Sequence, residues 1–493
     1  MNFNWRQFVP AAILLGSGVL VAGLVGFVWT SGLPQEVIWA TLGVLTVSFW
    51  LMHHAVRLFS FRTMSIPGFS YLVYLITILL PALSVYQAHP GPARNAFLFA
   101  VESASITIPL GSFFVNFVTS YNPRETRLYF EKPMASLESG SDSILCPAFL
   151  LALALGLAAK HMAEMPTVPL FYMILHPGAP ILLAMLREEA FKLLASNLSY
   201  GYALNLRVLY PYVVLLSFGG WLITRSTKWI TLFAVSLITA VIYSAATIEK
   251  SYVAFLAADL FMYFYLYRHG RVRTRTILAS FTAFIAFPML VVLLQYSRNY
   301  HGILAGFGYS FGAVAERLFN GPAETMYYYF TVFPRFQPFQ HGASIELLCK
   351  VMGWRRLNVP NFVGIYAEIV EFGTAPFLTI SANAGMVGSF YVDFGLYSVL
   401  IGCFLAGAIM QAAQVYLTRA PKSASNVAIY AFLFPTFGFL NSAALPTTLL
   451  SGGVIPVFVL AWLVTRLDNM FVPASEPRPD WVTQPSVIHS IHT

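Results

Sequence analysis

Long apolar runs recur along this chain and constrain its fold more than any other feature. About twenty apolar residues are needed to cross the hydrocarbon core of a bilayer as a helix. Runs of about that length cover residues 8–29, 36–56, 67–87, 95–120, 143–161, 207–224, 229–247, 251–267, 276–296, 396–417, 426–447 and 452–466. Because 58% of the residues are hydrophobic and only 10% are charged, the sequence predicts an all-α, polytopic membrane protein with about twelve transmembrane helices.

One long segment, 298–395, interrupts this pattern and cannot be read as a continuous membrane span. It mixes arginines, carboxylates and aromatic residues, which predicts a large loop containing short helices. We therefore divide the chain into four parts. Residues 1–297 form transmembrane helices with an interfacial outer segment at 163–206, residues 298–395 form the large loop, residues 396–471 form the C-terminal transmembrane helices, and residues 472–493 form a flexible cytoplasmic tail.

The basic residues predict the orientation of the chain. Short cytoplasmic loops are enriched in Lys and Arg, and the strongest cluster in a short loop is Arg268, Arg271, Arg273 and Arg275. This distribution puts both termini in the cytoplasm and the loop 298–395 on the outer face, which in the inner membrane of a bacterium is the periplasmic face. The net charge of +8 does not indicate nucleic-acid binding, because no basic helix interleaved with aromatic residues accompanies it.

Three stretches carry a resemblance to a known family. They are residues 187–211 and 317–330, which contain arginines and tyrosines, and the glycine-rich entry into an apolar run at 380–411. In the last stretch, Gly385, Gly388, Tyr391, Asp393 and Gly395 precede a glycine-spaced helix. Together these stretches resemble the outer loops of the Wzy-type oligosaccharide repeat unit (O-antigen) polymerases.

This resemblance implies a membrane glycosyltransferase of the GT-C superfamily, related to the O-antigen ligases. Such an enzyme polymerises polyprenyl-diphosphate-linked oligosaccharide repeat units into a bacterial surface polysaccharide. It is expected to be inverting and metal-independent and to use no cofactor. The expected partners are the lipid-linked donor and acceptor and the membrane lipids, with a chain-length regulator and a flippase as further candidates.

The leaving diphosphate requires a cationic site. Arginine suits this role because its planar fork donates two charge-assisted hydrogen bonds to phosphate oxygens and stays protonated. We expect Arg298 and Arg317 to hold the diphosphate and Arg187 to assist. Each has another reading: Arg298 could snorkel into lipid headgroups, Arg317 could pair with a neighbouring glutamate, and Arg187 could anchor an interfacial helix.

The acceptor hydroxyl requires a general base. An unperturbed imidazole titrates near neutrality, so His341 is the first candidate, although a lone loop histidine is commonly only solvated. Glu368, Glu371 and Asp393 are alternatives. Asp393 could instead cap the N-terminus of the next helix, because carboxylates are favoured there.

Further residues are candidates for substrate binding. Lys250 follows a tight turn between two apolar runs and could face an interior cavity. Arg335, Arg355 and Arg356 could gather anionic glycan or phosphate, or could form a solvated basic face. Tyr327 and Tyr328 could line a sugar groove by stacking or belong to an aromatic membrane belt.

Three other functions remain open at this stage. A ligase that transfers glycan to lipid A core would share the fold, but residues 379–383 contain no histidine before the glycine-rich helix entry, whereas ligases commonly have a His-Asn pair there. A flippase or transporter could use the same cations, although no inverted repeat is evident. A structural partner of an envelope complex would leave the arginines without a chemical role.

Overall fold

The computed structural model describes residues 32–57, 64–135, 144–176, 178–193, 199–248, 250–270, 274–296, 301–373 and 381–471. Within these ranges every regular element is a helix, as the sequence predicts. Eight helical stretches are long and apolar enough to cross a membrane. They are Gln35–Val56 (α2), Ile66–Ala88 (α3, η1 and α4), Arg94–Thr119 (α5), Leu145–Glu164 (α7), Tyr200–Thr224 (α10, η2 and α11), Thr227–Ala246 (α12), Leu396–Arg419 (α20) and Leu445–Leu467 (α22 and α23). The chain has the architecture of a multi-pass membrane protein.

The remaining predicted spans differ from these eight. The span at 8–29 lies outside the described residues. Helices α13 (Lys250–Tyr267) and α14 (Thr274–Gln295) fall on two predicted spans, but their described apolar stretches are shorter, at Ser251–Tyr267 and Phe284–Gln295.

The span predicted at 426–447 is not one continuous helix. Helix α21 (Ala424–Gly438) is followed by the 3-10 helix η4 (Phe439–Asn441) and, after a break, by the short helix α22 (Leu445–Leu449). Hydropathy is high across the break, but Pro446 lacks a backbone N–H and is favoured at a helix start rather than within a helix.

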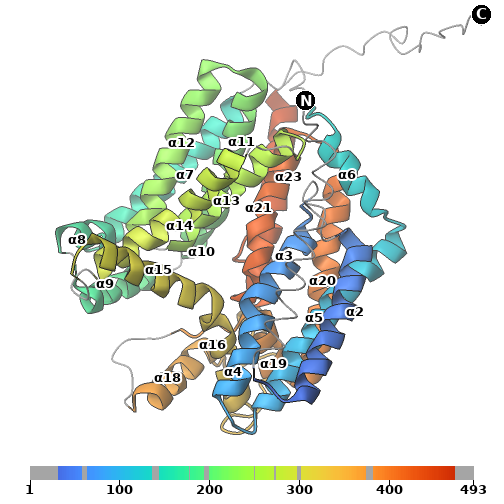
Figure 1. Ribbon diagram of the computed structural model, residues 1–493. Coiled ribbons are helices and arrows are strands. Elements are labelled where there is room, and N and C mark those ends of the chain that lie inside the picture. Colours follow the sequence, from blue (N-terminus) through green and yellow to red (C-terminus); the bar gives the residue numbers. More distant parts are fainter. Residues whose placement is uncertain are drawn as a thin grey trace, which may run out of the picture.

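Figure 1 shows the helices in two groups with α21 and α23 (Val454–Phe471) between them. Helices α2, α3 (Ile66–Tyr74), α5 and α20 form one group, and α7, α11 (Tyr210–Thr224), α12, α13 and α14 form the other. Helix α6 (Pro123–Glu131) lies at one end of the molecule, and α16 (Gly321–Val332), α18 (Val359–Phe372) and α19 (Gly385–Phe394) lie at the opposite end. We refer to these as the α6 end and the α16 end.

Segment 298–395 is largely helical where the structure describes it. Helix α15 (Ile303–Phe319) packs along α14, and α16 packs against α4 (Leu80–Ala88), α18 and α19. The short helix α17 is Glu346–Met352. Helix α8 (Pro169–Leu175) packs against α9 (Pro180–Leu193), α12 and α14.

Helices α5 and α20 cross closely because glycines face the crossing. A Cβ atom added to Gly407 would meet the carbonyl oxygen of Ile108, and one added to Gly111 would meet that of Phe404. The hydroxyl of Ser112 donates to the carbonyl of Gly407 over 3.1 Å. Small residues that let two backbones approach are a common basis of helix packing in membranes, where dispersion contacts replace the hydrophobic driving force.

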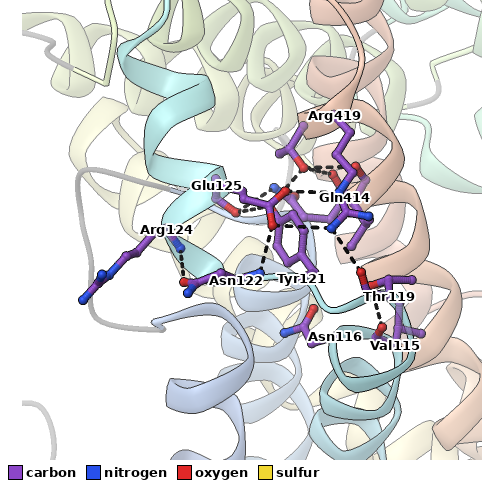
Figure 2. A network of polar contacts seen from close by, with 12 residues as sticks. Val115, Asn116, Thr119, Tyr121, Asn122, Arg124, Glu125, Gln414 and Arg419 are labelled. Atoms are coloured by element: carbon purple, nitrogen blue, oxygen red, sulfur yellow. Dashed lines mark hydrogen bonds and ion pairs between the residues drawn. The ribbon is translucent and has the colours of Figure 1, made fainter.

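Polar contacts tie the same two helices to α6 (Figure 2). Arg419 Nε, at the end of α20, donates to Glu125 Oε2 over 3.1 Å, and Arg419 Nη2 donates to the carbonyl of Thr119 over 3.1 Å. Asn122 and Glu125 form a capping box at the start of α6. Although partial burial raises the pKa of Glu125, the hydrogen bonds from Arg419 and the Asn122 backbone together lower it, so this carboxylate is ionised at neutral pH.

Lys422 forms a buried junction at the α6 end. Its Nζ donates to the carbonyl oxygens of Phe130 over 3.0 Å, Lys132 over 2.7 Å and Leu266 over 3.0 Å. Burial lowers the pKa of Lys422 to about 8, so most of the ammonium charge is kept at neutral pH. Three N–H donors meet three carbonyls near the C-terminal ends of α6 and α13, where a positive charge is favourable.

The α5–α20 crossing leads to a prediction. Gly407→Ala should destabilise the protein, because the added Cβ needs space that the carbonyl of Ile108 occupies. We expect a loss of about 1–3 kcal/mol, measured as a lower Tm in detergent. Gly156→Ala on α7 is the matched control, since a Cβ there meets nothing within 4 Å, and its Tm should be unchanged or higher. Equal Tm values for the two variants would contradict the role of this crossing.

A second prediction concerns Lys422. Lys422→Met keeps the length of the side chain but leaves three carbonyls without their donor, so we expect a loss of about 2 kcal/mol or more. The change should appear as a lower Tm and as faster amide exchange at the end of α13. Lys228→Met at the start of α12 is the control, since Lys228 is exposed and takes no part in these three contacts. If Lys422→Met retained the wild-type Tm, the junction would not be stabilising.

Candidate functional site

A cavity of about 740 Å³ lies between α13, α19, α21 and the residues that follow α21. Three arginines line it, and they come from separate parts of the chain: Arg187 from α9, Arg207 from η2 and Arg356 from the segment between α17 and α18. Two carboxylates, Asp259 and Asp393, line it as well. Segments far apart in the sequence thus bring basic and acidic side chains to the same cavity.

Arg207 is held on the cavity wall by a local irregularity. It lies in the π-helix η2 (Asn205–Leu209), and such wide turns occur often at functional sites. Its Nε donates to the Tyr252 hydroxyl over 2.8 Å and its Nη1 to the carbonyl of Ser451 over 3.5 Å. Asn205 donates to the carbonyl of Ala154 over 3.0 Å, which anchors η2 to α7. The guanidinium is therefore fixed in direction before any ligand binds.

Asp393 organises the turn that closes one side of the cavity. Its Oδ1 accepts from the backbone N–H of Gly342 over 3.0 Å, and its Oδ2 accepts from the Ser344 hydroxyl over 2.7 Å. Burial raises the pKa of Asp393, while these hydrogen bonds and the nearby His341 act in the opposite direction. Gly395, not Asp393, is the N-cap residue of α20, and it makes no side-chain cap. Asp393 therefore does not cap α20, which the sequence left as one reading of this residue.

His341 lies on this turn but outside the cavity wall. Its φ of 50° places it in the left-handed region, and its exposed ring packs edge-on against Phe394 at 5.5 Å between centroids. Ser344 and Ile345, a few residues later, do line the cavity. His341 therefore precedes two cavity-lining residues in the chain but is not itself among the described residues that line the cavity.

The other expected site residues fall into three groups. Arg187 and Arg356 line the cavity. Arg298 and the side chain of Lys250 lie outside what the structure describes. Arg317, Arg335 and Arg355 are exposed, and none of them is among the described residues that line this cavity.

Tyr327 and Tyr328 are buried in the protein interior and are not part of the cavity wall. Tyr327 stacks on His89 at 4.9 Å between centroids, and the Tyr328 hydroxyl donates to Glu371 over 2.9 Å. Their neighbour Tyr329 does line the cavity, and its hydroxyl donates to the carbonyl of Ala382. The aromatic run thus joins α16 to the elements around it and contributes one side chain to the site.

Two cavity-lining residues, Arg207 and Asp259, were not predicted as site residues from the sequence. Both stand in stretches that were counted as apolar membrane spans. The signal was present, because an ionisable residue inside a membrane span is costly and for that reason commonly functional. Asp259 is only 2% exposed and lines the cavity.

No family model, no curated protein and no solved structure matches this chain. Within the described residues, no group of three or more His, Cys, Asp and Glu side chains could hold a metal ion. The case for a function therefore depends on the chemistry of the cavity.

The role of Asp393 gives a third prediction. Asp393→Ala removes the acceptor from the buried N–H of Gly342, at a cost of about 1–3 kcal/mol. The amide of Gly342 should then exchange about ten- to a hundredfold faster, as measured by hydrogen–deuterium exchange of a peptide that covers 340–345. His341→Ala removes only an exposed ring and should leave this exchange unchanged. Equal exchange in wild type and Asp393→Ala would show that the turn is held by other contacts.

Proposed function

We propose that this protein is a membrane glycosyltransferase that polymerises polyprenyl-diphosphate-linked oligosaccharide repeat units into a surface polysaccharide. The observation that carries the proposal is the convergence of Arg187, Arg207 and Arg356 on one cavity. Three guanidiniums in a partly enclosed site suit a diphosphate, because guanidinium N–H groups donate charge-assisted hydrogen bonds to phosphate oxygens and stay protonated. The resemblance to the Wzy-type polymerases suggests that the reaction at such a site is the polymerisation of repeat units.

The proposed topology follows from the distribution of charge. The α6 end carries basic residues, among them Arg124, Arg127, Arg419 and Lys422, and positive residues accumulate on the cytoplasmic side. The α16 end would then face the periplasm, with the cavity accessible from the outer leaflet. We include about twelve spans, cytoplasmic termini and the bacterial inner membrane in this proposal.

In the proposed reaction, a hydroxyl oxygen of the acceptor sugar forms a bond to the anomeric carbon of the donor. The bond from that carbon to the diphosphate oxygen breaks, and its electron pair leaves with the polyprenyl diphosphate. The hydroxyl proton passes to a base, and attack from the face opposite the leaving group inverts the anomeric centre. The arginines stabilise the charge that develops on the diphosphate.

The base in this proposal is His341 or a nearby carboxylate. Both oxygens of Asp393 already accept hydrogen bonds from Gly342 and Ser344, which favours His341, whose ring is exposed three residues before the cavity-lining Ser344. Arg298 and Arg317 remain candidates for contact with the diphosphate as it enters from the membrane.

A flippase or transporter of the same lipid-linked units is the second candidate. Transporters place substrate sites near the middle of the membrane and build them from discontinuous helices. The break between α21 and α22 lines the cavity, and Asp259 lies about halfway along α13. These two features favour this alternative over the ligase.

Deletion of the gene distinguishes the candidates. For a polymerase we expect surface glycan that carries a single repeat unit, with the ladder of longer chains restored by the wild-type gene. A ligase predicts that polymer accumulates on the lipid carrier, and a flippase predicts unpolymerised units trapped on the cytoplasmic side. Gel analysis of surface glycan and of extracted lipid-linked glycan separates these outcomes.

Two adjacent arginines test the cavity itself. Arg356→Ala removes a cavity-lining guanidinium, and we expect polymerisation to fall at least about tenfold, because a charged hydrogen bond to phosphate contributes about 1.5–3 kcal/mol. Arg355→Ala removes an exposed neighbour outside the cavity wall, and its glycan ladder should match that of wild type. Both variants must be present in the membrane at wild-type levels. Equal ladders for the two variants would remove the main support for this site.

A further inference from the structure

The chemistry of the cavity changes along its depth. Tyr252, which contacts Arg207, stands near the start of α13, and Asp259 follows seven residues later on the same helix, which is about 10 Å farther along the axis. We call the region around Asp259 the inner compartment and define it by six cavity-lining residues: Phe255 and Asp259 on α13, Phe432 and Thr436 on α21, and Thr447 and Thr448 on α22. None of the cavity-lining arginines belongs to this set, and Arg207 lies beside it, since it donates to the carbonyl of Ser451, three residues after Thr448.

Two polar atoms of the inner compartment have no hydrogen-bond partner among the residues that the structure describes. They are Asp259 Oδ1 and Thr448 Oγ1, and each side chain is only 2% exposed. Buried polar atoms are nearly always hydrogen-bonded, because leaving one unpaired costs about 1–3 kcal/mol. Both residues line the cavity, so a ligand that enters it can supply the missing partners.

The surroundings of these atoms select the kind of ligand. The Asp259 carboxyl oxygens accept hydrogen bonds, and the threonine hydroxyls both donate and accept them. The rings of Phe255 and Phe432 add apolar surface, and Phe255 is fixed edge-on against Phe439 at 5.2 Å between centroids. A molecule with many hydroxyls and some exposed C–H groups satisfies all of these groups, and a sugar has this chemistry.

We infer that the inner compartment is a sugar subsite in which Asp259 and Thr448 bind hydroxyls of the glycan next to the diphosphate. This inference rests on the proposed function and adds a location for the sugar: the diphosphate lies against the arginines, and the first sugar residues extend inward between α13, α21 and α22. Asp259 is a specificity-determining residue in this arrangement and takes no proton from the reaction.

The test compares two lipids on the purified, full-length protein. The probes are the lipid-linked repeat unit extracted from the deletion strain and polyprenyl diphosphate without sugar. Both should raise the Tm of wild type, and the glycan-bearing lipid should raise it more. Asp259→Asn keeps the size of the side chain but replaces one carboxyl oxygen with an NH2 group, and we expect it to abolish this extra stabilisation while the response to bare polyprenyl diphosphate stays unchanged.

Kinetics provide a second readout. With the extracted units as substrate, Asp259→Asn should raise KM about tenfold or more with kcat within about threefold. If Asp259 were the general base, kcat would fall and the pH profile would change, and that result would overturn the inference. Thr448→Val should give a smaller rise in KM, and it keeps the test available if Asp259→Asn does not fold. Ser310→Ala removes another buried, unpartnered hydroxyl, on α15 outside the cavity wall, and should change neither constant.

The outcomes separate this inference from the proposed function. Wild type that polymerises the units but responds equally to both lipids would overturn the sugar subsite and leave the polymerase intact. Wild type that discriminates between the lipids through Asp259 but forms no polymer would support the subsite and overturn the polymerase.

Discussion

Backbone groups in a membrane must find hydrogen-bond partners within the protein, and this requirement determines where the chain can depart from helical geometry. Irregular backbone is tolerated at membrane depth only where protein covers it or where it lines a cavity. The break after α21 meets this condition. The backbone N–H of Ser442 donates to the carbonyl of Phe439 over 2.8 Å, and in the turn after α22 the N–H of Gly452 donates to the carbonyl of Thr447 over 2.6 Å. Helix α19 covers the break, because Gly385, with its φ of 63°, brings its backbone against Asn441. The cavity lies at this break.

The turn after α22 packs closely against its neighbours because it contains a glycine, Gly453. A Cβ on Gly453 would meet Val208 of η2 and Phe432 of α21. The turn after α22 therefore packs tightly between the two elements that carry cavity residues. Close packing at Gly453 and the hydrogen bond from Arg207 to Ser451 link η2, α21 and the turn into one wall. A wall built this way holds its arginine in place without a ligand.

Hydropathy was sufficient to predict the helical membrane fold, because burial of apolar side chains over about twenty residues leaves few alternatives. It could not locate the break at 439–444, since the sequence there remains largely apolar, whereas the packing of Gly385 of α19 against Asn441 depends on tertiary structure. Arg187 and Arg356 were found from their polar segments. Arg207 and Asp259 were counted as parts of membrane spans. Tyr327 and Tyr328 were predicted to line a sugar groove or to form a membrane belt, because their burial against α4, α5 and α18 depends on tertiary contacts that the local sequence does not show.

The Lys422 junction has a mechanical consequence. It binds the ends of α6 and α13 to the chain just before α21, so the two helices that carry Asp259 and Phe432 are pinned together at their bases. If α13 and α21 move apart, they must pivot about that point, so their separation increases with distance from it and is largest at the opposite ends of the two helices. A ligand too bulky for the cavity at rest would thus be admitted by displacement at the α16 end, the end at which Lys422 does not tie the two helices.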